Sequence, residues 1–400
     1  MKDWNLVCTG CGAVLPVADA RPRCAVCGEP LEVEGVSRGT VREGNRFGQT
    51  IFDRYADFLP FSPDDPPAGM REGFTPLVGS EKIAGELPVG SLDLKDESRN
   101  PTWSFKDRGT ASAVRHALAL GFKRIGTLSS GNMAASVAAY GARAGLPAII
   151  LVSASIPVEK LNPIAVYHPV LLRVEGDYGD LYFRSLEIGS REGIYFMNSD
   201  VPFRVEGSKT IAYEICEQLG FNAPDFVVVP TSSGGNLRGI IKGFEDFYRC
   251  GLIGRLPRFI CAQAKGCSPI FNAFTSGEER VRPLEKTDTI AHAIENPFPP
   301  SGNEVLRQLR ERNGIALAVT DDEILSAQGR LAGAGVFCQP AAAVPLAAVR
   351  RLCADGVIGK NDHVVCIVTG GGLKYTAVLD RLGFDVRTCR AGELEELLGE

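Results

Sequence analysis

The chain is organised around the ten residues Asn100-Pro-Thr-Trp-Ser-Phe-Lys-Asp-Arg-Gly109. Ser104 precedes Lys106 and a run of small helix-forming residues, so this serine can cap the start of a helix. Lys106 would then meet the positive end of the helix dipole, and Phe105 beside it would add desolvation. Both effects disfavour the charged amine and indicate a nucleophilic, Schiff-base lysine. On these ten residues alone, an ordinary surface lysine in a first helical turn is the simpler interpretation.

Three later loops are rich in glycine and hydroxyl residues: Ser129-Ser-Gly-Asn132, Thr231-Ser-Ser-Gly-Gly-Asn236 and Thr369-Gly-Gly-Gly-Leu-Lys374. Each follows an apolar run that predicts a buried strand. Amides at a helix start, with serine hydroxyls beside them, favour a phosphate cradle in the second loop. A tight structural turn is the alternative. The predicted strands are 92–97, 125–128, 148–152, 170–174, 194–196, 226–229, 258–263 and 363–368, and the predicted helices are 133–144, 178–191, 237–248, 321–332 and 342–352.

Together with Lys106, these loops resemble the pyridoxal-phosphate enzymes of fold type II, the tryptophan synthase β fold, and within them the threonine synthase family. The resemblance runs from about Phe61 to about Leu373, in the family's order. It implies a two-domain α/β protein with three-layer α/β/α sheets and a small N-terminal zinc ribbon. The expected divisions are a ribbon-like segment (1–35), the N-terminal part of the large domain (36–97), a smaller α/β domain with the cofactor lysine (98–205), and the large domain with the glycine loop (206–400).

The resemblance also implies roles for individual residues. Lys106 would carry pyridoxal 5'-phosphate, Asn132 would contact its phenolic oxygen, and Ser129 and Ser130 would help to hold the substrate carboxylate. Thr369 would face the pyridine nitrogen, and a neutral hydroxyl there suits elimination and replacement at Cβ or Cγ better than transamination. The cofactor phosphate would lie on the glycine loop, formed by Ser232, Ser233, Gly234, Gly235 and Asn236.

A second anion site is expected in the segment 198–207, Asn-Ser-Asp-Val-Pro-Phe-Arg-Val-Glu-Gly. Asn198, Ser199 and Arg204 offer two neutral donors and one guanidinium in a turn that Pro202 interrupts. An arginine in a loop is usually solvated, so this signal is weak by itself. The segment resembles the stretch with which threonine synthases bind the substrate phosphate, and the resemblance adds Arg108 to that group.

Two Cys-x-x-Cys-Gly knuckles lie near the N-terminus, with Cys8 and Cys11 in the first and Cys24 and Cys27 in the second. Two thiolates from each knuckle can complete a tetrahedral zinc site, and all-cysteine coordination leaves no position for catalysis. We therefore expect a structural or docking ribbon with Zn²⁺, the alternative being reduced thiols without metal.

The composition narrows the possible partners. The chain of 400 residues has 44% hydrophobic and 23% charged residues and a formal charge of -5, with both signs interspersed. Nothing in this indicates binding to nucleic acid or to an anionic membrane. Because no apolar run approaches a membrane span or a signal peptide, we expect a cytoplasmic protein. The resemblance implies a phosphorylated amino-acid substrate and a homodimer.

The resemblance favours the conversion of O-phosphohomoserine and water to threonine and phosphate. Some residues depart from the usual threonine synthase pattern, which has glycine where this chain has Trp103. One alternative is therefore a related enzyme acting on another amino acid with a leaving group, either a cysteate synthase-like β-replacement on O-phosphoserine or a serine/threonine deaminase. Another is a zinc-ribbon scaffold without turnover, which the intact Lys106 disfavours.

Overall fold

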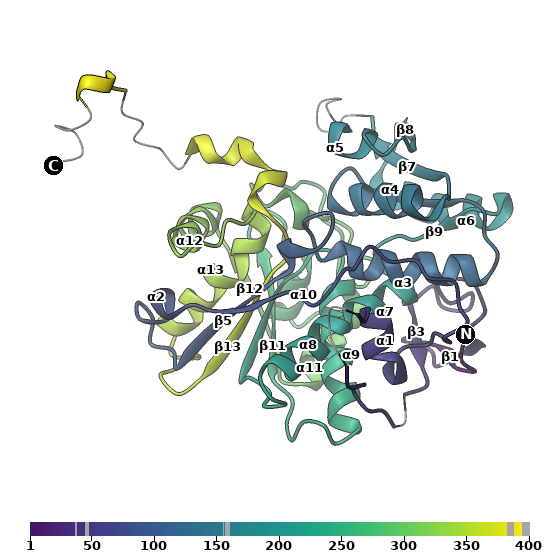
Figure 1. The fold of residues 1–400 in the computed structure, drawn as a ribbon, viewed down its shortest axis with the longest axis horizontal. Helices are drawn as coiled ribbons and strands as arrows, with labels where there is room; N and C mark the ends of the chain where they lie inside the picture. The colour runs from purple at the N-terminus through teal and green to yellow at the C-terminus, as the bar shows by residue number, and fades with distance from the viewer. Residues whose placement is uncertain (37, 45–47, 155, 157–160, 382–387, 394–400) are drawn as a thin grey trace.

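The computed structural model describes residues 1–36, 38–44, 48–154, 156, 161–381 and 388–393 (Figure 1). Its larger sheet has six strands in the order β12-β11-β10-β13-β5-β4, all parallel except β4, which is antiparallel to β5. The strands are β4 (Leu77–Gly79), β5 (Ser91–Asp96), β10 (Phe226–Pro230), β11 (Arg258–Ala264), β12 (Ile315–Val319) and β13 (His363–Val368).

Alternate residues of the central strands feed two different hydrophobic cores. On β10, Val227 and Val229 pack into one core, whereas Phe226 and Val228 pack into the other. This is the two-residue period of a strand whose two faces are both covered, and it explains the continuous apolar runs in the sequence. The first core takes in α8 (Thr210–Gln218), α9 (Gly235–Arg249), α10 (Pro269–Thr275) and α11 (Gly302–Glu311); the second takes in α2 (Glu81–Ala84), α12 (Asp321–Gly333) and α13 (Pro340–Ala354).

The smaller sheet is wholly parallel, with the strand order β8-β7-β6-β9. Its helix α4 carries alanine, serine or glycine at six of its nine buried positions, and these small side chains let it lie close to β6 and β7. In Figure 1 this sheet occupies the upper right, and α3 runs beneath it. The elements of this part are α3 (Lys106–Ala119), β6 (Ile125–Leu128), α4 (Asn132–Ala144), β7 (Ala148–Ser153), α5 (Asn162–Ala165), β8 (Val170–Val174), α6 (Tyr178–Glu192) and β9 (Tyr195–Phe196).

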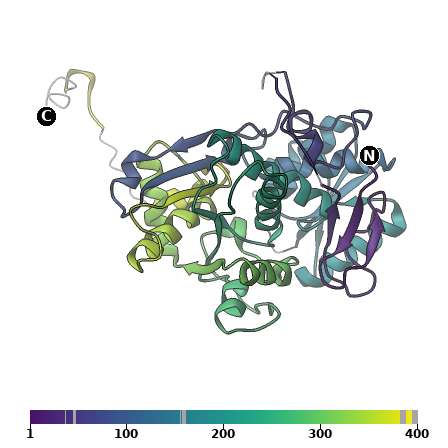
Figure 2. The ribbon, with the colours of Figure 1, turned by 90° about the horizontal axis from the view of Figure 1, so that it is seen from below.

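The N-terminal segment forms a small antiparallel sheet in the order β2-β1-β3, made of β1 (Asn5–Cys8), β2 (Val14–Pro16) and β3 (Leu31–Glu34). Leu6, Leu31 and Val33 are buried in the same core as the smaller sheet and the inner helices. Figures 1 and 2 show this segment, in purple, lying against the body near α9 and near the helix α7 (Pro202–Ser208). It is therefore packed on the body of the protein, as is the following short helix α1 (Ile51–Arg54).

The segment after β9 differs from the expected turn. Pro202 begins the helix α7 (Pro202–Ser208), where its fixed φ is favourable and its missing N–H is not needed. The predicted domain boundary between residues 205 and 206 lies inside this helix, so the chain crosses it without a linker. Among the described residues, no helix combines the length and the apolarity that a bilayer span requires.

Candidate active site

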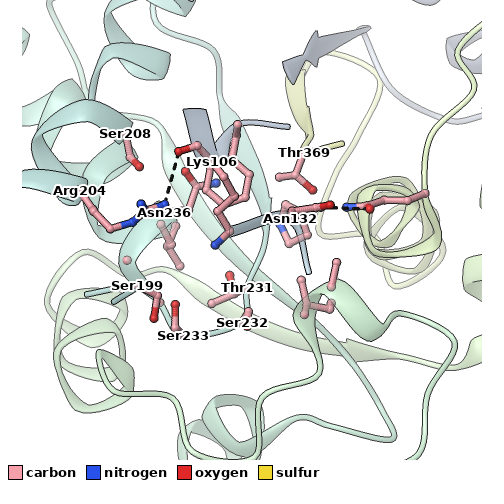
Figure 3. Close-up of a pocket in the computed structure, with 18 residues that line it drawn as sticks. Lys106, Asn132, Ser199, Arg204, Ser208, Thr231, Ser232, Ser233, Asn236 and Thr369 are labelled. Atoms are coloured by element: carbon pink, nitrogen blue, oxygen red, sulfur yellow. Dashed lines mark hydrogen bonds between the residues drawn. The ribbon is translucent and has the colours of Figure 1, made fainter. Parts of the chain in front are cut away.

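The candidate site lies where the carboxyl ends of parallel strands from both sheets meet. The loops after β6, β10 and β13 and the start of α3 all line one region, which Figure 3 shows in close-up. Such an edge is the usual ligand site of parallel α/β sheets, because helix N-termini and loop amides converge there. An outer cavity of about 670 Å³ adjoins an inner pocket. The residues that line both are Lys106, Asn132, Ser199, Ser232, Ser233, Ala293 and Gln339.

Lys106 is the first residue of α3 and lines both cavities. Ser104 does not take the cap position, which falls at Phe105, but its Oγ accepts a hydrogen bond from the Lys106 amide at 3.3 Å. The amine lies 4.5 Å from the centroid of the Phe105 ring. Burial, with the charge of Arg204 as a smaller cause, lowers the pKa of Lys106 from 10.5 to about 7. The amine is therefore poised to act as a nucleophile and a base near neutral pH.

This pKa predicts how the rate of reaction with pyridoxal phosphate, the cofactor expected from the sequence, should depend on pH. Below about pH 7 the amine is protonated and cannot attack an aldehyde, so the capture rate should rise through about pH 7 and level off above it. Stopped-flow absorbance after mixing with pyridoxal phosphate measures the midpoint. Arg204→Gln should move the midpoint to higher pH because it removes a neighbouring positive charge, and Arg204→Lys is the charge-retaining control. A midpoint near 10 in the unmodified protein would contradict the assignment.

The first turn of α3 is fixed by Asp107, which is fully buried. Its carboxylate accepts hydrogen bonds from the Thr102 amide and hydroxyl and from Ser136 Oγ on α4, each at 2.6 Å. The Phe105 amide also donates to the Thr369 carbonyl at 3.1 Å, directly after β13. The position of Lys106 is thus set by contacts to its own loop, to α4 and to the large sheet.

The glycine loop has the geometry of an anion cradle at the start of α9. Gly234 adopts a φ of +96°, and a Cβ there would lie 2.8 Å from Val305. A Cβ on Gly235 would lie 2.4 Å from the Ser199 carbonyl oxygen. Only glycine is compatible with this combination of backbone conformation and close packing, and the arrangement leaves the first amides of α9 facing the pocket.

Two side chains at this cradle have buried polar atoms that no described residue pairs with. They are Asn236, through both its amide nitrogen and its oxygen, and Ser199, through its hydroxyl. Buried polar groups are normally satisfied, so these atoms indicate a bound polar ligand. The amides, the serine hydroxyls and the low-pKa lysine together fit pyridoxal phosphate, which needs an amine for its aldehyde and donors for its phosphate.

Arg204 lies on the other side of the lysine from Thr369 and Asn132 (Figure 3). Its guanidinium donates to Thr110 Oγ1 at 2.9 Å and to the Lys106 carbonyl at 3.4 Å, and it lines the inner pocket. Burial lowers the pKa of Arg204 to about 10, so the side chain keeps its charge at neutral pH. It therefore presents a desolvated cation to the pocket.

Gln339 and Ser208 line the pocket although nothing in the sequence analysis assigned them to it. Asn132 Nδ2 donates to Gln339 Oε1 at 3.2 Å, so the glutamine orients the asparagine amide. Gln339 directly precedes α13, whose first residue is Pro340, and this helix-start position is a signal that could have found it. Ser208, at the end of α7, had no comparable signal.

Arg108 does not reach the site, which corrects its predicted role in substrate binding. It is fully buried on the far side of α3's first turn and lines neither cavity. Its guanidinium makes paired hydrogen bonds to Glu97 at 2.7 and 2.8 Å and to Glu214 at 2.6 and 2.8 Å. Two carboxylates saturate the donors that a phosphate would need.

Asn198 also has a different place from the expected one. Its Oδ1 accepts from the Leu128 amide at 3.0 Å, and its Nδ2 donates to Ser185 Oγ at 3.0 Å. These contacts tie β6 to the segment after β9, and the side chain lines neither cavity. Asn198 therefore positions its neighbour Ser199. Ser129 and Ser130 line the outer cavity.

Trp103 adopts a left-handed backbone conformation, with φ +58°, and the residue is 61% exposed. Its amide donates to the Asn100 carbonyl, and its carbonyl accepts from the Gly371 amide, so the loop holds this conformation. The backbone thus keeps a geometry suited to glycine, with a bulky residue in it.

We expect Trp103→Gly to be more stable than Trp103→Ala by about 1 kcal/mol. Both variants lose the exposed ring, but only alanine retains the steric cost of a Cβ at positive φ. Urea unfolding of the two variants side by side measures the difference. Equal stability, or a more stable alanine variant, would show that the backbone is not strained at this position.

The four knuckle cysteines lie together, with all their Sγ atoms within 4.8 Å of one another. Cys8 and Cys27 are separated by 3.3 Å and Cys11 and Cys24 by 3.6 Å between sulfurs. Thiolates at about 2.3 Å from one zinc ion lie about 3.8 Å apart, so the cluster has nearly the required dimensions. Backbone amides of Gly10 and Cys11 point at Cys8 Sγ, and that of Val26 points at Cys24 Sγ.

Comparison with known proteins agrees with this geometry. Residues 69–370 match the family model described as "Pyridoxal-phosphate dependent enzyme". Threonine synthases of Methanocaldococcus jannaschii and Methanosarcina acetivorans are each 37% identical, over 92% and 93% of this chain and 92% of each relative. That of Halalkalibacterium halodurans is 37% identical over 81% of this chain and 89% of its own.

Solved structures show the same fold. Threonine deaminase isoform 2 from Solanum lycopersicum has a TM-score of 0.67 at 22% identity, covering 87% of this chain and 91% of its own. Maize serine racemase has a TM-score of 0.63 at 21% identity, covering 77% and 91%. The expected two-domain α/β fold of type II and the expected cofactor class are confirmed. The chain is a pyridoxal-phosphate-dependent enzyme and belongs to the threonine synthase family.

Proposed function

We propose that this enzyme converts O-phosphohomoserine and water to threonine and phosphate. The observation that carries the proposal is the buried guanidinium of Arg204 in the inner pocket beside Lys106, a cation additional to the amides at the start of α9. Ser199, which lies against Gly235 at the edge of the cradle, adds a buried hydroxyl that no described residue pairs with. Asn236, predicted as a cofactor ligand, lies on the same side of Lys106 (Figure 3). A phosphorylated amino acid needs such a second anion site.

The proposed roles follow from these positions. Bound pyridoxal phosphate supplies electron withdrawal from the amino acid's Cα. The Lys106 amine takes and returns protons at Cα and Cβ, which its pKa of about 7 permits at neutral pH. Ser129, Ser130 and the amides at the start of α4 hold the substrate carboxylate, and Asn132 is kept in place by Gln339. Ser199 and Arg204 hold the phosphate that leaves Cγ.

The glycine loop and Thr369 would hold the cofactor itself. Ser232, Ser233, Gly234 and Gly235 line the inner pocket at the positive end of α9, the favoured place for the cofactor phosphate. Thr369 follows β13 and lines the pocket opposite Arg204, where its hydroxyl would meet the pyridine nitrogen. An uncharged partner there leaves the ring a weaker electron sink, which suits elimination.

A panel of substrates tests the proposed reaction against its alternatives. O-phosphohomoserine, O-phosphoserine and L-threonine are supplied in parallel, and phosphate, ammonia and amino-acid products are quantified. We expect phosphate and threonine from O-phosphohomoserine, with much slower turnover of the other two compounds. Preferential phosphate release from O-phosphoserine would favour β-replacement, and ammonia from L-threonine would favour a deaminase. Either result would overturn the proposal.

We also propose that the four-cysteine cluster holds a structural zinc ion. The sulfur separations and the amides directed at Cys8 and Cys24 support this, and four thiolates leave no open coordination position. The protein as purified should contain a single zinc ion per chain, and Cys24→Ser should lose most of it. Metal analysis by mass spectrometry measures this, with the exposed Cys389→Ser as the control. Equal zinc in both variants would refute the site.

Assembly and location stay predictions. A homodimer is expected from the resemblance, and light scattering at several protein concentrations measures the mass directly. A cytoplasmic location is likewise expected, and cell fractionation tests it. Neither is needed for the roles given above.

A further inference from the structure

We propose that Arg23 is a positioning residue that couples the cysteine cluster to the cofactor-binding loop, so that the state of the N-terminal ribbon sets the affinity for pyridoxal phosphate. The ribbon here means residues 1–35. The metal part of this inference rests on the proposed zinc site, whereas the part concerning Arg23 depends only on contacts within the chain.

Arg23 belongs to the second knuckle and also reaches the enzyme body. Its Nε donates to the Gly28 carbonyl at 2.6 Å, directly after Cys27. Its Nη1 forms an ion pair with Asp200 and donates to the Pro300 carbonyl at 3.2 Å. One planar guanidinium thus joins the knuckle to two body segments that are far apart in the sequence, and lysine has no comparable fork.

Both body segments touch the cofactor loop. Asp200 is fully buried and follows Ser199, whose carbonyl oxygen is packed against Gly235. Pro300 precedes Ser301, whose amide donates to the Ser233 carbonyl at 2.9 Å and whose side chain is packed against Gly234. A displacement of Arg23 would therefore move Ser199 and Ser233 and change the packing of both glycines of the cradle.

Two further hydrogen-bonding residues also connect the ribbon to the cradle, through α9. Arg238, one turn into α9 and fully buried, donates to Ser301 Oγ at 3.0 Å and to the Leu31 carbonyl of β3 at 3.5 Å. Lys242, one turn further, donates to the Val33 carbonyl. Two side chains on one face of α9 therefore bind the ribbon, and the N-terminus of α9 forms the cradle. Arg23 binds the two loops that contact this N-terminus.

The test compares Arg23→Gln with Arg21→Gln. Arg21 lies in the same ribbon, is half exposed, and pairs with Asp19 of the ribbon. Each apo-protein is titrated with pyridoxal phosphate, and the visible absorbance band gives the dissociation constant without any substrate. Metal content and unfolding temperature are measured on the same samples. The titration is run well below the unfolding temperature of every variant.

We expect the dissociation constant for pyridoxal phosphate to rise by about tenfold in Arg23→Gln, because the buried Asp200 loses its ion pair with Arg23, although the Tyr182 hydroxyl still donates to it. Arg21→Gln should match the unmodified protein. Removing the metal with a chelator should weaken cofactor binding in the unmodified protein but change Arg23→Gln by less than about twofold, since the connection is already broken. If Arg23→Gln does not fold, Arg23→Lys, which keeps the charge and loses the fork, takes its place.

A cofactor affinity within about twofold of the unmodified protein, in folded Arg23→Gln with its zinc retained, would overturn the inference. So would equal effects of chelation in both proteins. Absence of zinc from the purified protein would refute the metal part and leave the Arg23 comparison intact. Because the titration uses no substrate, failure of the proposed reaction would not affect its outcome.

Discussion

Replacing Lys106 with alanine should lower the rate of threonine formation by about a thousandfold or more. The variant loses both the amine that bonds the cofactor and the base that moves protons at Cα and Cβ. The fold should persist, because the side chain lines a cavity and makes no ion pair among the described residues. The visible absorbance band of the purified protein should also change, since the cofactor is no longer covalently held.

Chemical rescue distinguishes this role from a structural one. Adding methylamine should restore part of the activity of Lys106→Ala, because a small primary amine can enter the space left by the side chain and accept the proton. The control is Lys123→Ala, at an exposed position after the opposite end of α3, which should retain full activity. Unchanged turnover in Lys106→Ala would remove the lysine from the mechanism.

Replacing Arg108 with methionine should destabilise the protein by about 3–5 kcal/mol. Arg108 is the shared partner of Glu97 and Glu214, and none of the three is exposed to solvent. Methionine would fill much of the space but leave two carboxylates with too few partners; Lys95 would remain beside Glu214 at 2.7 Å. Calorimetric unfolding measures the loss. A role in substrate binding would instead raise KM with little change in stability.

The control for Arg108 is Arg99→Met. Arg99 is 67% exposed and pairs with Asp96, so its loss should cost less than about 0.5 kcal/mol. Comparable losses of stability in the two variants would show that the buried cluster contributes no more to the free energy of unfolding than an exposed ion pair does.

Acid should weaken the contribution of this cluster in a defined pH range. Burial alone would raise the pKa of Glu214, but Arg108 and Lys95 lower it from 4.5 to about 2. A carboxyl with a lowered folded-state pKa contributes stability above its unfolded pKa and loses that contribution as the pH falls to the folded value. The stability difference between the unmodified protein and Arg108→Met should therefore narrow between about pH 4.5 and pH 2. A constant difference across this range would contradict the ion-pair explanation.

Much of the fold could be predicted because its central strands are buried on both faces. The bounds 125–128, 170–174 and 363–368 agree with β6, β8 and β13. The helix α11 and the edge strand β12 were not predicted. Val305, Leu306 and Leu309 do have helical spacing, so the signal for α11 was present. The five apolar residues of β12 are also compatible with a buried helix, and it is their pairing with β11 that makes them a strand.

The site was less predictable where roles depend on distant partners. Residues at strand ends and helix starts, such as Lys106 and the glycine loop, could be placed because local sequence fixes both the element and its end. The place of Arg108 could not be predicted, because its partner Glu214 lies 106 positions away in the sequence. Although Lys106 and Arg108 are two residues apart, the first lies in the pocket and the second lies behind it. Asn198 shows the same limit, since its acceptor oxygen is taken by the Leu128 amide.

The most direct test of the proposed reaction is to follow oxygen from ¹⁸O-labelled water with O-phosphohomoserine as substrate. Elimination breaks the Cγ–O bond, so the released phosphate should carry no label, and water adds at Cβ, so the threonine hydroxyl should carry it. Mass spectrometry of both products gives the answer in one reaction. Label in the phosphate with homoserine as product would reveal simple phosphate-ester hydrolysis, and threonine without label would show that its hydroxyl does not come from water; either would contradict the account.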